Sequence, residues 1–270
     1  MERNKVCLDT LCAALCEVMG IEKPKEASDA YKGLAEYADK AFGGKSADRI
    51  FMYNPDGVAE WIYKKYPHLL KEVTDIAGLQ IPFCTVMPSV TPVCFGTMYT
   101  GAKPEVHGIK SYEKPVIKID SIFDALIRSG KKCAIVSTEN DSMSKIFLER
   151  DMDYYIYKTV EEVDAKAAEL IIKDSYDFLA VYNRDYDTKM HKYGPEGIEA
   201  LAELRSNSED FAMFDALIRN HWQSHNTLIG FATDHGCHEI DGDCGSHGLD
   251  MPEDLNIVHF YKAYPKKEIN

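Results

Sequence analysis

The segment "DFLAVYNRDYDTKMH", residues 177–191, contains an apolar run followed at once by acidic residues and a histidine. Residues 177–183 predict a buried strand, and the amphipathic pattern at 159–174 predicts a helix before it. Further strands are predicted at 49–54, 132–138, 226–234 and 255–263, and further helices at 57–66, at 121–130 and from about Pro195 to Trp222. This alternation, with strands rich in Val, Ile, Leu and Phe, predicts an α/β fold: a three-layer α/β/α sandwich with a mainly parallel central sheet.

The chain length and the even pattern predict one domain. With 270 residues and 45% hydrophobic content, the chain can bury a continuous core. No repeat or low-complexity linker divides residues 1–270. Helical spacing at 6–19 and from Ser28 to Phe42 predicts two packing helices. We therefore expect a single domain over 1–270, with residues 1–45 as a helical extension packed on it.

The charge balance restricts the class of partner. The formal charge is −13, from 44 acidic and 31 basic residues, so a nucleic acid polymer would be repelled. A small anion can still be a substrate where a bound metal reverses the local field. No run reaches the roughly 18 apolar residues that span a bilayer, and no small-residue cleavage site follows the first apolar stretch. We expect a cytoplasmic protein with no membrane partner, and a homo-oligomer remains open.

The eight cysteines lack the paired spacing of a zinc finger and the density of a disulfide scaffold. Reduced, mostly buried thiols are therefore expected. Cys12 and Cys16 lie four residues apart on a predicted helix, a spacing that two metal ligands can also have. Because no histidine or third cysteine joins them, we favour core packing for this pair.

Three of the predicted strands end in residues typical of metal ligands. They are Asp56 after 49–54, then Asp185, Asp187 and His191 after 177–183, then Asp234 and His235 after 226–234, and a later loop adds His247. Singly, an aspartate after a strand is often a turn or cap residue, and a pair four residues apart is often a surface contact. Their recurrence favours one site, because the carboxyl ends of parallel strands meet at one edge of a sheet. These candidates are too many for one tetrahedral zinc ion, so two metal ions are implied.

The segment "PSVTPVCFGTMYTGAKPEVHGI", residues 88–109, carries the most specific resemblance. With Thr91 before a predicted helix and its "TG..P..HGI" ending, it resembles the nucleophile segment of the alkaline phosphatase superfamily, in the nucleotide pyrophosphatase/phosphodiesterase branch. The segments "DTKMHKYGP", "TDHG" and "SHG" are similar to the metal motifs of that branch and follow in the same order. The resemblance runs from Asp56 to His247 and implies an alkaline-phosphatase-like fold.

The resemblance also implies roles for individual residues. One metal ion would be bound by Asp187, His191 and His247, and the other by Asp56, Asp234 and His235, with Thr91 as a further ligand of the second ion. Thr91 would also attack phosphorus, and metal coordination is a recognised way to activate a hydroxyl nucleophile. The alternative for Thr91 is a buried or capping residue of the following helix. Zinc is the family expectation, and manganese would accept the same ligands.

The activity that these roles imply is a metal-dependent phosphodiesterase or nucleotide pyrophosphatase. Small phosphoesters would be hydrolysed through a phosphothreonine intermediate on Thr91, with phosphodiester and pyrophosphate bonds favoured by the branch resemblance alone. Two alternatives stay open. One is a phosphonate hydrolase of the same superfamily, and the other is a metal-binding relative without turnover.

The sequence departs from the branch at Cys94, where an asparagine usually donates a hydrogen bond to the phosphoryl oxygen. A thiol is a weaker donor, so Cys94 either marks a different substrate pocket or is a small buried residue. We interpret His107 and Gly108 as loop structure, and residues 237–244 as a polar loop that carries His247 into place rather than a further metal site. The chain is also short for the superfamily, so determinants of substrate recognition are mostly missing from view.

Overall fold

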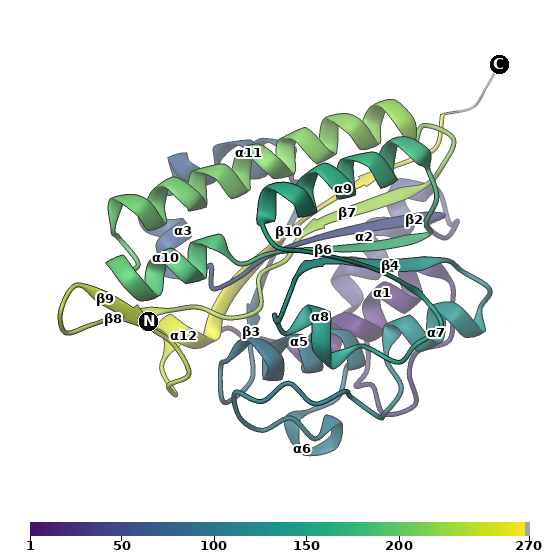
Figure 1. The fold of residues 1–270 in the computed structure, drawn as a ribbon. Helices are drawn as coiled ribbons and strands as arrows, with labels where there is room; N and C mark the ends of the chain where they lie inside the picture. The colour runs from purple at the N-terminus through teal and green to yellow at the C-terminus, as the bar shows by residue number, and fades with distance from the viewer. Residues whose placement is uncertain (268–270) are drawn as a thin grey trace.

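A computed structural model describes residues 1–267 as a helix-covered sheet of eight strands (Figure 1). The strand order across the sheet is β1-β3-β10-β7-β2-β6-β4-β5. The strands are β1 (Val6–Cys7), β2 (Arg49–Pro55), β3 (Leu79–Cys84), β4 (Cys133–Thr138), β5 (Asp153–Tyr157), β6 (Phe178–Asn183), β7 (Thr227–Phe231) and β10 (Asn256–Tyr264). All pairings are parallel except those of β10 with β3 and β7. The predicted α/β/α sandwich with a mainly parallel sheet is confirmed.

Helices cover both faces of the sheet because successive strand residues point to opposite sides. Ile50 and Met52 of β2 pack in one apolar cluster, and Phe51 and Tyr53 pack in the other. The first cluster includes residues of α1 (Leu11–Met19), α2 (Lys32–Phe42), α5 (Thr91–Thr100), α7 (Ile122–Arg128) and α8 (Met143–Ile146). The second includes residues of α3 (Glu60–Lys65), α4 (Lys71–Ile76), α9 (Val160–Lys173), α10 (Asp185–Tyr193) and α11 (Ile198–His221). Figure 1 shows α9 and α11 on one side of the sheet and α1, α5, α7 and α8 on the other.

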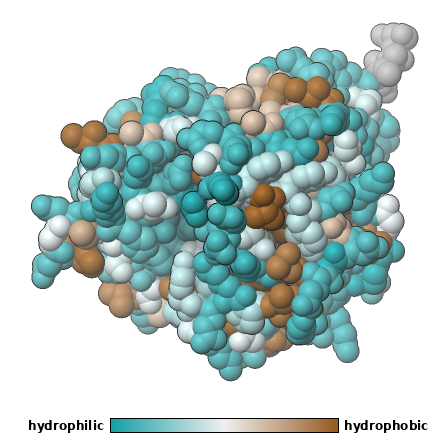
Figure 2. Space-filling view, in the orientation of Figure 1, coloured by the Kyte–Doolittle hydropathy of each residue, from teal (hydrophilic) through white to brown (hydrophobic). Residues whose placement is uncertain are grey.

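The shorter elements lie mostly at the edges and between the longer helices. They are the 3-10 helices η1 (Leu8–Thr10) and η2 (Pro67–Leu70), the helices α6 (Pro104–His107) and α12 (Pro252–Leu255), and the two-stranded hairpin β8 (His238–Ile240) and β9 (Cys244–Ser246). Within residues 1–267, no helix combines the length and apolarity that crossing a bilayer requires. The face in Figure 2 is mostly hydrophilic, with separate hydrophobic patches.

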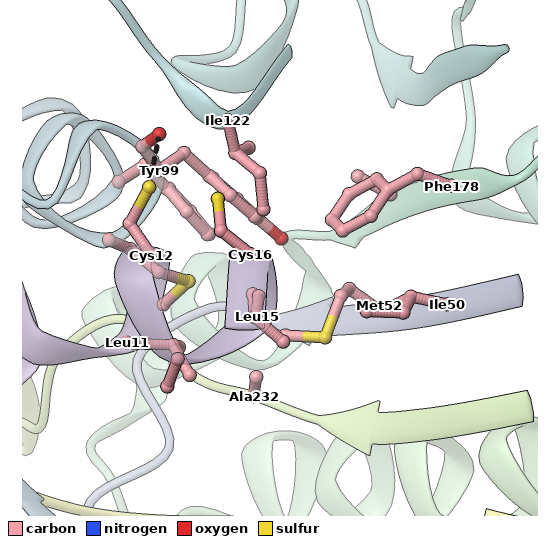
Figure 3. Packing of buried hydrophobic residues seen from close by; sticks show 14 of the residues in the cluster. Leu11, Cys12, Leu15, Cys16, Ile50, Met52, Tyr99, Ile122, Phe178 and Ala232 are labelled. Atoms are coloured by element: carbon pink, nitrogen blue, oxygen red, sulfur yellow. Dashed lines mark hydrogen bonds between the residues drawn. The ribbon is translucent and has the colours of Figure 1, made fainter. Parts of the chain in front are cut away.

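The first helices are part of the core. Leu15 and Cys16 of α1 lie beside Met52 and Phe178 from the sheet in the packing view (Figure 3). Cys12 and Cys16 are at most 1% exposed, as the core-packing interpretation predicted. The Cys12 thiol donates a hydrogen bond to the carbonyl of Tyr99 at 3.4 Å. Full burial of each large apolar side chain here contributes about 1.5–3 kcal/mol to stability. Helix α1 therefore anchors the helices on this side of the sheet, and its two cysteines pack in the core rather than bind a metal.

Three features differ from the predicted pattern. The predicted first helix is preceded by β1, which pairs with β3 at the sheet edge. β3 and β5 were not predicted, and β3 contains Pro82, which lacks an N–H and weakens the strand signal. β10 is antiparallel because the chain leaves β7, forms the β8–β9 hairpin and α12 at the same edge, and re-enters the sheet from that edge without a crossover.

Candidate two-metal centre

The predicted ligands lie at the carboxyl ends of three adjacent strands. β2 pairs in parallel with β7 on one side and with β6 on the other. Asp56 follows β2 directly, so it lies between the residues that follow β7 and those that follow β6. Asp234 and His235 come after β7, and Asp187 is in the first turn of α10 after β6. The strand order therefore gathers ligands that are up to 179 residues apart in sequence, as Asp56 and His235 are.

The first group is completely buried and includes the predicted nucleophile. The Nε2 atom of His235 lies 3.2 Å from Asp56 Oδ1 and 3.4 Å from Asp234 Oδ2. Thr91 Oγ1 lies 3.2 Å from the same Nε2 and 3.4 Å from Asp56 Oδ2. Thr91 is the first residue of α5 and is 3% exposed. The structure thus brings all four residues together, with the hydroxyl at the N-terminus of a helix.

The second group lies beside the first and is more exposed. His191 Nε2 lies 3.4 Å from Asp187 Oδ2, and His247 Nε2 lies 3.7 Å from Asp187 Oδ1. The two histidine Nε2 atoms are 3.1 Å apart. Ligand atoms of these three residues all lie within 4.8 Å of one another.

Asp187 belongs to both groups. Asp187 also forms a second set of three with Asp56 and His235, whose ligand atoms lie within 4.8 Å of one another. The resemblance pairs Asp234 with Asp56 and His235, and the geometry adds Asp187 at the junction. The two predicted ligand sets are therefore contiguous, with Asp187 between them.

The three histidines have the same orientation. In each, Nδ1 faces a backbone carbonyl: His235 that of Gly236 at 2.9 Å, His191 that of Gly245 at 3.0 Å, and His247 that of Ser89 at 2.8 Å. A carbonyl only accepts, so each Nδ1 carries a proton, and in the neutral ring each Nε2 is an unprotonated acceptor. In protein metal sites, a bond of this kind at the other ring nitrogen holds the metal-binding histidine in its orientation.

In their neutral form these Nε2 acceptors face carboxylate acceptors, which is unfavourable unless a proton or a metal cation lies between them. The buried oxygens Asp56 Oδ1, Asp187 Oδ1 and Asp234 Oδ2 accept no hydrogen bond from any described residue. Within residues 1–267, no lysine or arginine forms an ion pair with these three carboxylates. Burying a charge without a partner is costly. The donor set, carboxylate oxygen and imidazole nitrogen, suits zinc or manganese, so the residues fit two divalent ions.

The pKa values show the same conflict between the ligands. Burial and then the charge of Asp56 raise the pKa of Asp234 well above its usual range. Burial alone would lower the pKa of His235, but the charges of Asp234 and Asp56 raise it to about 10. Burial, followed by the charge of His235, lowers the pKa of His247 to about 3. Divalent ions would replace these opposed protonation states with a uniform positive charge.

Several residues that position the ligands were not predicted. The hydroxyl of Tyr182 donates to Asp56 Oδ2, and the N–H of Gly57 donates to Asp234 Oδ1 at 3.2 Å. The carbonyls of Ser89 and Gly245 act through the backbone, so no residue type marks them.

The remaining candidates lie outside the ligand groups. Cys94 is one turn after Thr91 but is fully buried, and burial raises the pKa of its thiol well above the usual range. His107 accepts from the N–H of Ile109 at 3.3 Å and contacts Thr97 Oγ1 at 3.0 Å, which holds the turn at the end of α6. Asp185 is the strand-end aspartate that joins neither group, and its backbone N–H bonds to Asn183 Oδ1 instead.

A comparison of the chain with protein families finds a match over about half of its length. The model described as type I phosphodiesterase / nucleotide pyrophosphatase matches residues 129–262. This range contains five of the predicted ligands: Asp187, His191, Asp234, His235 and His247. A search of curated proteins by sequence gave no match.

Solved structures show the same fold at low sequence identity. Murine ectonucleotide pyrophosphatase/phosphodiesterase 5 superimposes with a TM-score of 0.60 and 16% identity, covering 72% of this chain and 58% of that one. The human protein of the same name gives 0.58 and 16%, with the same coverage. Phosphonoacetate hydrolase from Sinorhizobium meliloti, in complex with phosphonoformate, gives 0.54 and 18%, covering 73% of this chain and 59% of that one. The chain therefore spans less than two thirds of the length of these proteins.

These solved structures share the fold that the resemblance to the alkaline phosphatase superfamily implied. Within that superfamily, the matched range confirms the resemblance to the nucleotide pyrophosphatase/phosphodiesterase-like branch.

Proposed function

We propose that the chain is a two-metal hydrolase of small phosphoesters that forms a phosphothreonine on Thr91. The observation that carries the proposal is the convergence of three histidine Nε2 atoms and three carboxylates beside a buried threonine hydroxyl. Each Nδ1 is held by a backbone carbonyl, so the Nε2 atoms are fixed toward the centre. A core threonine alone would not need such surroundings.

The two ions would be held by the ligands already described, with Asp187, His191 and His247 on one and Asp56, Asp234 and His235 on the other. When bound, they would lower the pKa of a coordinated hydroxyl or water and neutralise the charge of the phosphoryl group. Zinc is our first choice and manganese the second, because both accept this mixture of oxygen and nitrogen.

The proposed reaction has two steps, formation of a phosphothreonine and its hydrolysis. Thr91 Oγ1 attacks phosphorus, its P–O bond forms as the bond to the leaving group breaks, and the threonine proton leaves with the departing alcohol in the net reaction. Water then cleaves the phosphothreonine, which restores the hydroxyl and releases the second product. Because Thr91 begins α5, the transferred phosphoryl group lies at the positive end of a ten-residue helix.

Diester and pyrophosphate bonds are the favoured substrates because of the branch resemblance. In support, one murine structure of the same fold is described as an inactive threonine-to-alanine variant in complex with AMP. A phosphonate hydrolase is the second candidate, because phosphonoacetate hydrolase in complex with phosphonoacetate shares the fold with a TM-score of 0.53.

The test is a set of initial rates on bis-p-nitrophenyl phosphate, p-nitrophenyl phosphate and phosphonoacetate, with added zinc or manganese. Thr91→Ala should abolish hydrolysis while two ions remain bound, and Thr91→Ser, which keeps a hydroxyl, should retain part of it. The relative rates on the three substrates show whether phosphodiesters, phosphomonoesters or phosphonates are the preferred class. Equal rates for wild type and Thr91→Ala would remove Thr91 as the nucleophile.

A further inference from the structure

Asp254 is a fully buried carboxylate outside the two ligand groups. It lies in α12, between the loop that contains His247 and β10, and is 0% exposed. Its Oδ1 accepts from His238 Nδ1 at 2.7 Å, and its Oδ2 accepts from the backbone N–H of Leu249 at 2.8 Å. Both carboxylate oxygens are thus used, and each contacts a segment next to metal ligands.

The two contacts hold His247 from both sides. His238 lies opposite Ser246 in the β8–β9 hairpin, and Ser246 is the residue directly before His247. Leu249 lies two residues after His247. The His247 ring itself is held by the bond from its Nδ1 to the carbonyl of Ser89. The Asp254 side chain therefore links the segments on either side of His247, while the Ser89 carbonyl fixes its ring.

The loop that contains Asp234 and His235 depends on Asp254 in a different way. The N–H of Gly236 donates to the backbone carbonyl of Asp254 at 2.8 Å. Replacement of the Asp254 side chain leaves that carbonyl in place. The side chain therefore acts on one ligand group, and the backbone serves the other.

From this geometry we propose that Asp254 is a positioning residue that sets the metal affinity of the group Asp187, His191 and His247. It has little influence on the group of Asp56, Asp234 and His235. The inference rests on the proposed two-metal function, because it assumes that both groups bind an ion. Loss of a bond behind a metal-binding histidine typically weakens metal affinity about 10–100-fold.

Asp254→Ala removes both contacts, and Asp254→Asn is the conservative partner. The asparagine oxygen can still accept from Leu249, and its amide can donate to His238 Nδ1, because that ring can adopt the other tautomer. Glu253→Gln removes a neighbouring charge from the same helix and controls for electrostatics. Should Asp254→Ala fail to fold, Leu249→Pro removes the N–H donor and leaves the Asp254 side chain in place, at a residue that is 55% exposed.

The measurement is zinc binding by competition with a chromophoric chelator, together with thermal unfolding of the metal-free proteins. We expect wild type, Glu253→Gln and Asp254→Asn to bind two ions with similar affinities. Asp254→Ala should keep one ion at wild-type affinity and bind the other about 10–100-fold more weakly. Two unchanged ions, or an equal loss at both groups, would overturn the inference. A wild-type protein that binds fewer than two ions would instead contradict the proposed function.

Discussion

Replacement of Gly57 by alanine should disrupt the metal centre through one added methyl group. Gly57 has a φ of 74°, in the left-handed region that favours glycine. A Cβ atom at this position would lie 2.9 Å from Asp187 Oδ1 and 3.3 Å from Asp187 Cβ. The substitution therefore combines backbone strain with a collision against the carboxylate that touches both ligand groups.

The two effects have separate magnitudes. Left-handed backbone costs a non-glycine residue about 1–2 kcal/mol in stability. Restoring an ordinary contact of at least 3.4 Å requires Asp187 Oδ1 or the backbone to move by about 0.5 Å, and metal–ligand distances tolerate only about 0.2 Å. We therefore expect Gly57→Ala to lose about 1–2 kcal/mol of unfolding free energy and, in addition, about 10-fold or more in metal affinity.

Gly43→Ala is the matched control, because Gly43 also has a positive φ, 62°, but no atom lies within 4 Å of an added Cβ. Urea denaturation of the metal-free proteins should show similar losses for the two variants. Zinc competition and hydrolysis of bis-p-nitrophenyl phosphate should show a defect in Gly57→Ala alone. If both variants bind zinc as the wild type does, the proposed role of close packing against Asp187 is refuted.

Three further predictions use single buried side chains. Tyr182→Phe removes the hydroxyl that donates to Asp56, so metal affinity and turnover should fall about 10-fold with an unchanged fold by circular dichroism; wild-type zinc affinity would argue against this. Cys94→Asn should lower stability by about 1–3 kcal/mol without raising diesterase rates, because Cys94 is fully buried; a faster diesterase would instead restore Cys94 to the substrate pocket. Burial lowers the pKa of His259 from 6.5 to about 4, so the unfolded chain binds its proton first. The contribution of neutral His259 to the free energy of unfolding is fully present above about pH 6.5 and falls by up to about 3 kcal/mol as the pH drops toward 4. His259→Gln should therefore flatten the dependence of unfolding free energy on pH in urea titrations.

The layer architecture and the ligand types could be predicted because they depend on local pattern. Alternating strands and helices indicate a sheet covered on both faces, and Asp56 and Asp234 can be located because each follows a recognisable strand. The burial of Cys12 and Cys16 also followed from helical spacing and the lack of partner ligands. The roles of Thr91 and the six ligands came from resemblance, and they remain proposals.

The tertiary structure decided which of these residues meet and how they are held. The order β7-β2-β6 places Asp187 beside both ligand groups, and strand order depends on long-range packing that no local pattern records. The tautomers of the three histidines depend on backbone carbonyls, which every residue type has. The direction of β10 and the burial of Asp254 depend on where the chain re-enters the sheet. The residue types at the site were thus readable from the sequence, whereas their distances depend on the folded chain as a whole.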